Sequence, residues 1–191
     1  MAPQSIKRDK LTVYVWPVGP FQENSYLVVN ENNVGTIIDP GFSQSYEEKS
    51  FQDFVENNNI QLDFILNTHC HIDHILGNDF CVKKWNLPLY YHELEESNIE
   101  RSIQMSALWG IDYTPSPSAT AHIDENSKIL IAQESVETWY VPGHCKGHLA
   151  FIHHPSHSVF SGDVLFRESI GRIDLPGGDA DEIEASIKNL Y

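Results

Sequence analysis

The amino-acid sequence predicts an α+β fold in which β-sheets are covered by helices. Runs of alternating, β-branched residues, which are typical of strands, occupy both ends of the chain, and helical patterns are interspersed among them. Strands and helices do not alternate regularly, as a βαβαβ fold would require. The length of 191 residues corresponds to about one domain, so we expect residues 1–191 to form a single domain with a substantial core.

The first half of the chain contains three predicted strands, a helix and a further strand. A Gly-Pro break separates the first two strands, and an Asp-Pro-Gly turn ends the third. The helix carries Phe51, Phe54 and Val55 at helical spacing and stops in a run of asparagines. The predicted ranges are 11–18, 24–29, 35–38 and 62–66 for the strands and 46–59 for the helix.

The second half is predicted to continue with two helices on either side of a short strand, followed by more strands and a last helix. A Pro/Ser-rich loop over 113–120 is too short to link two domains. His153, His154 and His157 fall in a predicted hairpin turn, and we interpret them as solvated surface residues. The predicted ranges are 73–85, 93–109 and 181–190 for the helices and 88–91, 128–132, 136–141, 149–153 and 159–161 for the strands.

Composition and charge argue against several classes of partner. Twelve basic and 27 acidic side chains give a net charge of −15 without a basic cluster, which disfavours nucleic acid and anionic membrane surfaces. The N-terminus has no apolar stretch typical of a secretory signal, and no apolar run is long enough to span a membrane. Cys70, Cys81 and Cys145 lack a CxxC spacing, so we interpret them as small buried residues rather than a disulfide framework. We expect a cytoplasmic protein of unknown oligomeric state.

A metal site is the main functional prediction. His69, His71, Asp73 and His74 lie within six consecutive positions directly after an apolar strand. Side chains two residues apart in an extended chain point the same way, so His69 and His71 can bind one ion. A helix beginning near Asp73 turns Asp73 and His74 to another face, where a second ion can bind. Imidazole and carboxylate ligands suit zinc, with iron or manganese as alternatives.

Two later segments add candidate ligands. His144 lies in a Pro-Gly turn after a predicted strand, where a loop can project its imidazole into a cleft as the third nitrogen ligand of the first ion. His148 lies at the entrance of the next strand, and we interpret it as a supporting residue. Asp163 ends a strand in Ser-Gly-Asp, and its spacing alone fits a turn residue and a ligand equally well.

Together these motifs resemble the metallo-β-lactamase superfamily over most of the chain. The resemblance rests on His-x-His-x-Asp-His at 69–74, Pro-Gly-His at 142–144 and Ser-Gly-Asp at 161–163. With Asn-x-Tyr-Leu at 24–27 and Asp-Pro-Gly at 39–41, the chain is similar to glyoxalase II hydroxyacylglutathione hydrolases and their shorter relatives. The resemblance implies a four-layer αββα sandwich with the site at the edges of the sheets.

The resemblance also implies a set of ligands for two divalent metal ions. The implied ligands are His69, His71 and His144 for the first ion, Asp73 and His74 for the second, and Asp163 as a bridge. The family supplies a further histidine to the second ion from a late Gly-His-Gly segment, and residues 170–191 contain no such segment. Two interpretations remain open: the chain is an incomplete copy that lacks the last strand of the fold, or its second site has one ligand fewer.

The activity implied is hydrolysis of a small-molecule thioester such as S-lactoylglutathione. Two divalent ions would provide a hydroxide nucleophile at neutral pH, and Asp73 would orient it and accept its proton. Arg172 falls where these enzymes carry a basic residue that contacts a substrate carboxylate. A salt bridge that fixes the loop of Arg172 explains this residue equally well.

An iron-dependent persulfide dioxygenase is the alternative function on the same scaffold. That family resembles this chain in the metal loop and in a Gly-Arg-x-Asp motif, which residues 171–174 match. It uses only two histidines and the carboxylate of Ser-Gly-Asp as ligands. His148, which the hydrolases tend to retain, favours hydrolysis. A lactamase or nuclease fits the acidic charge and the lack of a secretory signal less well, and a non-catalytic binding module leaves the metal motifs unexplained.

Overall fold

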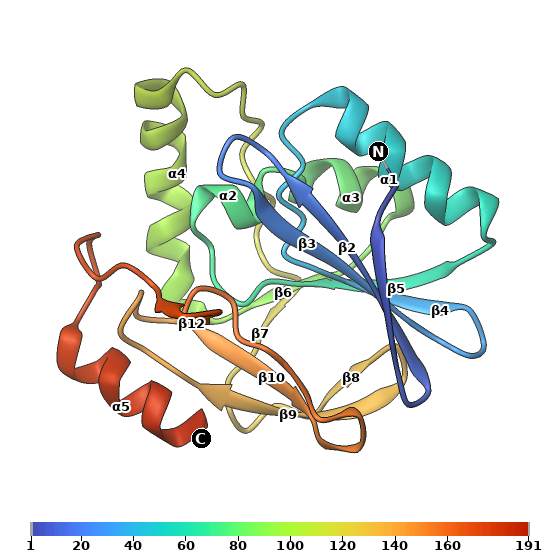
Figure 1. Cartoon of the computed structure of the whole chain (residues 1–191). Coiled ribbons are helices and arrows are strands. Elements are labelled where there is room, and N and C mark those ends of the chain that lie inside the picture. The colour runs from blue at the N-terminus through green and yellow to red at the C-terminus, as the bar shows by residue number, and fades with distance from the viewer. Residues whose placement is uncertain (1, 191) are drawn as a thin grey trace.

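Two stacked sheets with helices on both outer faces form the protein in a computed structural model that describes residues 2–190 (Figure 1). The large sheet has seven strands in the order β1-β2-β3-β4-β5-β6-β7, and the second sheet has four in the order β11-β10-β9-β8. Helices α1 to α4 lie on the outer side of the large sheet, and α5 covers the second sheet. This is the α+β fold that the sequence predicted and the four-layer αββα sandwich that the family resemblance implied.

The first half of the chain builds most of the large sheet. Strands β1 to β4 are antiparallel neighbours, and β5 joins β4 in parallel through the crossover helix α1. Strand β1 was not predicted, because all of its residues are exposed and a strand without a buried face shows no alternation. The elements are β1 (Gln4–Arg8), β2 (Leu11–Val18), β3 (Glu23–Asn30), β4 (Val34–Ile38), α1 (Ser45–Asn57) and β5 (Gln61–Leu66).

The second half completes the large sheet and forms the second one. The predicted strands and the last helix are present, and the helix predicted over 93–109 begins with a 3₁₀ turn over 93–95. The short strands β7, β12 and β13 were missed because two residues show no periodicity. The elements are α2 (Ile72–Ile75), α3 (Asn78–Trp85), β6 (Leu89–Tyr91), η1 (Glu93–Glu95), α4 (Glu96–Trp109), β7 (Ala121–His122), β8 (Ile129–Ile131), β9 (Glu134–Tyr140), β10 (Leu149–His153), η2 (His154–Ser156), β11 (Ser158–Phe160), β12 (Leu165–Phe166), β13 (Ser169–Ile170) and α5 (Ala180–Leu190).

The helix predicted over 73–85 is two helices, α2 and α3, and this prediction was wrong in its continuity. The chain bends at Gly77, whose backbone N–H donates to the Pro40 carbonyl at 2.7 Å. A Cβ atom on Gly77 would lie 2.9 Å from that carbonyl oxygen and 2.8 Å from the Phe42 ring. The bend therefore docks the metal loop onto the Asp-Pro-Gly turn, and glycine allows this close approach.

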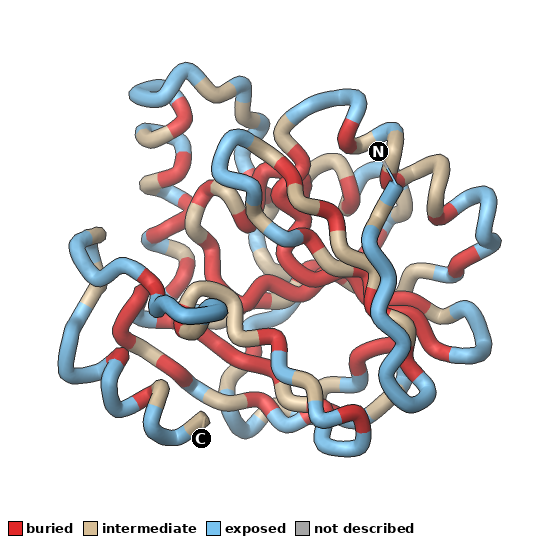
Figure 2. The backbone as a smooth tube through the Cα atoms, in the orientation of Figure 1, coloured by how far each residue is buried: buried red, intermediate tan, exposed pale blue. Residues whose placement is uncertain are grey.

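Apolar side chains fill the space on both sides of the large sheet. The central strands are accordingly formed largely of buried residues (Figure 2). Between the sheets lie Leu66, Phe151 and Phe160, whereas Trp16 and Phe51 pack between the large sheet and its helices. Each such side chain stabilises the fold by roughly 1.5–3 kcal/mol through burial. The three cysteines are buried and free, as expected. Among residues 2–190, no helix combines the length and apolar character needed to cross a membrane.

His153 corrects the interpretation of the 153–157 turn. His154 and His157 are exposed as predicted, but His153 is buried, so the prediction was wrong for this residue. Its place in β10 turns the side chain inward, and Nδ1 lies 2.6 Å from the Ser156 hydroxyl oxygen. The 3₁₀ turn η2 folds Ser156 back onto the strand and gives the buried imidazole a polar partner.

Candidate metal centre

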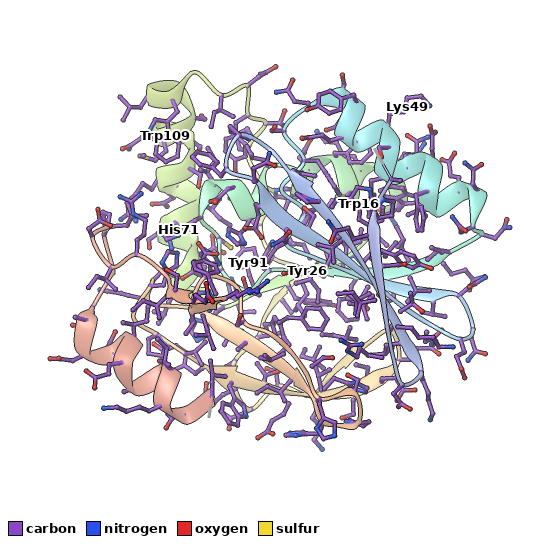
Figure 3. All side chains as sticks on the ribbon, in the orientation of Figure 1. Trp16, Tyr26, Lys49, His71, Tyr91 and Trp109 are labelled. Atoms are coloured by element: carbon purple, nitrogen blue, oxygen red, sulfur yellow. The ribbon has the colours of Figure 1, made fainter. Side chains whose placement is uncertain are left out.

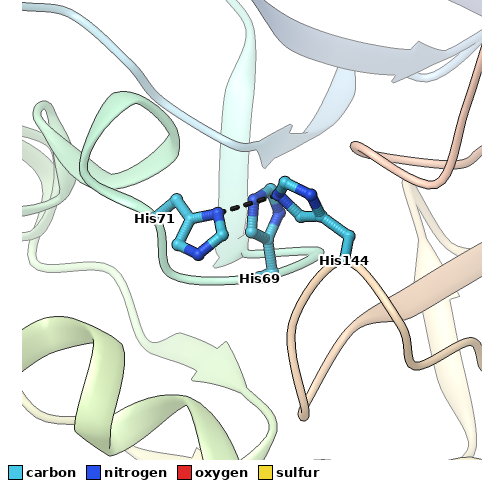
Figure 4. Close-up of side chains that lie close together, drawn as sticks. All are labelled: His69, His71 and His144. Atoms are coloured by element: carbon cyan, nitrogen blue, oxygen red, sulfur yellow. Dashed lines mark hydrogen bonds between the residues drawn. The ribbon is translucent and has the colours of Figure 1, made fainter. Parts of the chain in front are cut away.

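Three loops meet at one edge of the sandwich, and each directly follows a strand. They follow β5, β9 and β11, and the first two carry His69, His71 and His144 (Figure 4). The ligand nitrogens of these three residues lie within 4.8 Å of one another. The closest pair is His71 Nδ1 and His144 Nε2, at 2.8 Å. The structure therefore brings together three imidazoles from positions far apart in the sequence.

A second group of donors lies beside the first. His74 Nε2 is 3.3 Å from Asp163 Oδ1 and 3.9 Å from Asp73 Oδ2. The other Asp163 oxygen, Oδ2, lies 3.6 Å from His144 Nε2. Asp163 thus lies between the two groups, which is the position a bridging ligand requires. All six candidate ligands named from the sequence lie in this one region.

A buried carboxylate orients two of the imidazoles. Asp39 accepts hydrogen bonds from the backbone N–H and the hydroxyl of Thr68, at 2.8 and 2.6 Å, and lies 3.1 Å from His74 Nδ1. The Thr68 hydroxyl oxygen in turn lies 3.1 Å from His69 Nδ1. With both Nδ1 atoms engaged, Nε2 of His69 is buried in the site without a hydrogen-bond partner, and Nε2 of His74 faces the carboxylates of Glu23 and Asp163, each at 3.3 Å. A buried imidazole nitrogen without a partner and one surrounded by carboxylates both fit a bound metal ion.

Loop contacts orient the third imidazole and the bridging carboxylate. His144 Nδ1 donates to the backbone carbonyl of Arg172 at 2.7 Å, which turns Nε2 toward the site. His148 Nε2 accepts the backbone N–H of Asp163 at 3.1 Å, and its ring stacks on His69 with 4.6 Å between centroids. His148 thus has the supporting position that we interpreted from the sequence.

Burial keeps the first group of imidazoles neutral. It lowers the pKa of His69 well below its usual value and that of His71 to about 3, and neighbouring imidazoles act in the same direction. Burial also lowers the pKa of His144, although Asp163 opposes the effect. Neutral imidazoles keep a lone pair on a ring nitrogen at pH 7, which is the form that binds a metal ion.

The second group is dominated by charge. Burial lowers the pKa of His74, but the nearby carboxylates, with Glu23 the largest contributor, outweigh it and raise the pKa well above the usual value. For Asp163 burial raises the pKa, and the His74 imidazole outweighs that effect and holds the pKa well below its usual range. The acidic side chains here compensate a positive charge at their centre, which a divalent cation can provide.

Glu23 belongs to the second group and was missed by the sequence analysis. It lies at the start of β3, and its Oε2 atom is 3.3 Å from His74 Nε2. Glu23, Asp73 and His74 form a further set of donors within 4.8 Å of one another. Burial raises the pKa of Glu23 to about 7. No local motif marks this residue, because its partners lie some 50 positions later in the chain.

Glu95, also missed, ties the two histidine-bearing loops together. This fully buried carboxylate ends η1 and accepts the backbone N–H groups of Cys70 and Gly147, at 2.7 and 2.8 Å. Cys70 separates His69 from His71, and Gly147 precedes His148. A Cβ on Gly147 would lie 2.8 Å from the Glu95 side chain, so only glycine at this position lets the loop approach the carboxylate so closely. Glu95 therefore sets the spacing between the two loops.

Replacing Glu95 by alanine should lower the free energy of unfolding by about 3 kcal/mol, because the two backbone donors and the Asn98 amide lose their shared acceptor in the interior. Metal affinity should fall by about 10- to 100-fold as the loops separate. Denaturant unfolding and metal titration measure the two effects. Glu93→Ala, at an exposed position of the same 3₁₀ turn, is the control and should change neither. Unaltered stability of Glu95→Ala would contradict this role.

A cavity opens from the metal centre along α4. His71, Asp73, His144 and Asp163 line it, together with Phe21, Ile72 and residues of α4 and of the loop 172–176. Arg172 lines the cavity, and its guanidinium forms two 2.7 Å hydrogen bonds to the exposed Asp174 carboxylate. The structure thus contains the salt bridge that was the alternative explanation for Arg172.

An αββα sandwich with histidines and carboxylates gathered at one edge defines a metal-dependent hydrolase scaffold. The family model of the metallo-beta-lactamase superfamily matches residues 18–191, and the chain belongs to this superfamily.

Curated relatives agree at this level. A Bacillus subtilis protein described as a probable metallo-hydrolase is 34% identical over 173 residues, which are 90% of this chain and 79% of the relative. A Haemophilus influenzae protein described as the hydroxyacylglutathione hydrolase GloC is 29% identical over 93% of this chain and 83% of its own length.

Solved structures show the same fold. The di-iron-bound form of TTHA1623 is similar with a TM-score of 0.80 and 31% identity, over 100% of this chain and 85% of that one. The BLEG-1 B3 metallo-beta-lactamase gives a TM-score of 0.83 and 31% identity, over 92% and 83% of the two chains. Membership in the superfamily supports a metal-dependent hydrolase, and the relatives' names differ in substrate.

Proposed function

We propose that this metallo-hydrolase cleaves a small-molecule thioester, such as S-lactoylglutathione, at a centre of two divalent metal ions. The observation that carries the proposal is the second group of donors beside the three imidazoles, with Asp163 between them. A hydrolase with two ions needs both groups, whereas a mononuclear dioxygenase needs only two histidines and one carboxylate. The description of the Haemophilus influenzae relative supports the choice of substrate.

The residues present fit the ions. His69, His71 and His144 would hold the first, Asp73 and His74 the second, and Asp163 would bridge them. Divalent ions held here would supply Lewis acidity, which polarises a carbonyl group and acidifies water. We propose zinc because imidazole and carboxylate donors suit it, and the di-iron form of TTHA1623 makes iron the alternative.

The protein side chains would provide positioning and proton transfer. Asp73 lines the cavity beside the donors, and burial raises its pKa, so its carboxylate can accept a proton from water more readily than an exposed one. We propose Asp73 as the residue that orients the attacking water and accepts its proton. The leaving thiolate, with an ordinary thiol pKa of about 8.5, needs little further assistance.

Purified, metal-loaded protein should hydrolyse S-lactoylglutathione and consume no oxygen. Loss of the thioester absorbance measures the first, and an oxygen electrode with glutathione persulfide as substrate measures the second. Metal analysis on the same sample should give zinc. A chelator should abolish turnover, and added zinc should restore it.

Oxygen uptake in proportion to the persulfide, together with no thioester turnover and with bound iron, would reassign the protein as a persulfide dioxygenase. The dioxygenase is tested because the chain carries the Gly-Arg-x-Asp segment at 171–174, in which Arg172 and Asp174 form a salt bridge. A cytoplasmic location and the absence of nucleic-acid partners remain predictions from charge and sequence.

A further inference from the structure

One face of helix α4 lines the cavity, and this face carries both polar and apolar side chains. Asn98, Arg101, Ser102, Met105 and Trp109 line it, at the three- and four-residue spacing that places side chains on one side of a helix. The helix leads from the metal loop near His71 toward Trp109 at its other end (Figure 3). A substrate that reaches the metal centre along this cavity therefore passes Arg101.

Arg101 is a cation without an acidic partner. No Asp or Glu among residues 2–190 forms a salt bridge with its guanidinium, which lies in a half-buried position. Its Nη1 atom donates instead to the neutral Asn98 amide oxygen at 2.7 Å. Arg172, the other guanidinium of the cavity, is already paired with Asp174. Of these two arginines, Arg101 is the one whose guanidinium is available to bind an anion.

The position of Arg101 is built by the core. Asn98 is buried, and its amide nitrogen donates to the buried Glu95 carboxylate at 2.8 Å. This contact fixes which end of the amide faces Arg101, because only the oxygen can accept from a guanidinium. The carboxylate that ties the metal loops together thus also positions Arg101 through Asn98. Such an arrangement holds the guanidinium in one place relative to the metal centre.

Because the protein is strongly acidic, a single cationic side chain in this cavity should have a large effect on the binding of anions. With a net charge of −15, the protein as a whole repels anions, so an anionic substrate needs a local positive group to bind. Arginine matches a carboxylate through two parallel hydrogen bonds, which strengthen where water is partly excluded. Beyond Arg101 the cavity becomes apolar, where Trp109 contacts Phe21 with 5.3 Å between ring centroids.

We infer that Arg101 forms an anion-binding subsite that selects thioesters carrying a carboxylate on the thiol or acyl part. The inference rests on the proposed function for the identity of the substrate, and its binding test does not require turnover. The carboxylate contacts Arg101 while the thioester carbonyl lies at the metal centre and apolar parts contact Met105 and Trp109.

The test compares two probes that cannot be hydrolysed, S-hexylglutathione and its dimethyl ester, by calorimetry on the metal-loaded protein. The wild type should bind the carboxylate form about tenfold more tightly than the ester, and added salt should reduce the difference. Arg101→Met should abolish this preference without changing the affinity for the ester. Unchanged binding of the ester also shows that the variant is folded. Arg101→Lys should retain part of it, and Arg8→Met, on exposed β1, should retain all of it.

Four results would overturn the inference: no preference in the wild type, an unchanged preference in Arg101→Met, an equal loss of both probes in that variant, or a preference abolished by Arg172→Met instead. Turnover separates this inference from the proposed function. With S-lactoylglutathione, Arg101→Met should raise KM about tenfold and leave kcat nearly unchanged. An Arg101-dependent preference without thioester hydrolysis would keep the subsite and reject the thioesterase, whereas hydrolysis with an unchanged KM in Arg101→Met would do the reverse.

Discussion

Replacing His71 by alanine is expected to remove the ion proposed for the first group of donors and to lower kcat/KM for S-lactoylglutathione by about three orders of magnitude. Its Nδ1 atom lies 2.8 Å from His144 Nε2, so the two nitrogens converge on one point, and the variant leaves that point with two imidazoles. His71 is half-buried at the edge of the cavity, so its truncation should have little effect on the core. Elemental analysis and steady-state kinetics measure the two losses.

The matched control for His71 is His154→Ala. His154 is exposed on the far hairpin, where it pairs with Glu137 rather than with any candidate ligand. Its metal content and activity should equal those of the wild type, and circular dichroism should show both variants folded. Full metal content and activity in His71→Ala would remove this residue from the ligand set.

Asp163→Asn is expected to weaken metal binding in both donor groups and to reduce affinity at the second by at least about 100-fold. The two carboxylate oxygens lie 3.3 Å from His74 Nε2 and 3.6 Å from His144 Nε2. Asparagine keeps the shape but replaces one oxygen with an NH₂ group, which cannot bind a cation, and it removes a negative charge. The protein should therefore purify with fewer ions, and competition with a chelator should show the loss in affinity.

Asp53→Asn provides the comparison, because Asp53 forms a surface ion pair with Lys49 on α1 and lies outside both donor groups. Its metal stoichiometry should be unchanged. Two ions bound with wild-type affinity in Asp163→Asn would show that Asp163 does not bridge the groups, and His74 with Glu23 and Asp73 would then account for the second site alone.

The sequence predicted the helices and longer strands well because each buries one face. Alternation in β2 and β3 and helical spacing in α1 follow directly from which residues face the core. Each failure has a specific physical cause. Strand β1 is exposed throughout, the break at Gly77 depends on its contact with Pro40, and His153 is buried by a partner in the following turn.

The candidate ligands could be named from the sequence because metal sites use few residue types in short motifs. His69, His71, Asp73 and His74 lie within six positions, so one strand end and one helix start bring them near each other. His144 and Asp163 follow strands, whose ends carry side chains to the edge of a sheet. Residue type and local spacing named the histidines and Asp73 as candidates, whereas the spacing of Asp163 fitted a turn residue equally well and the family resemblance implied its role as a ligand.

Only the tertiary structure identified the residues that act on those ligands from elsewhere in the chain. Asp39 meets His74 across 35 positions, and Glu95 meets Cys70 and Gly147 across 25 and 52. The available charge of Arg101 depends on which acids lie near it and on how Asn98 is oriented. Such contacts depend on how strands and helices pack. The position of a single carboxylate or guanidinium in the sequence belongs to no periodic pattern or motif from which its partner could be predicted. The sequence, through its local patterns and its family resemblance, therefore predicted the layers of the fold and the candidate ligands, and packing decided how the ligands are oriented and which cation faces the cavity.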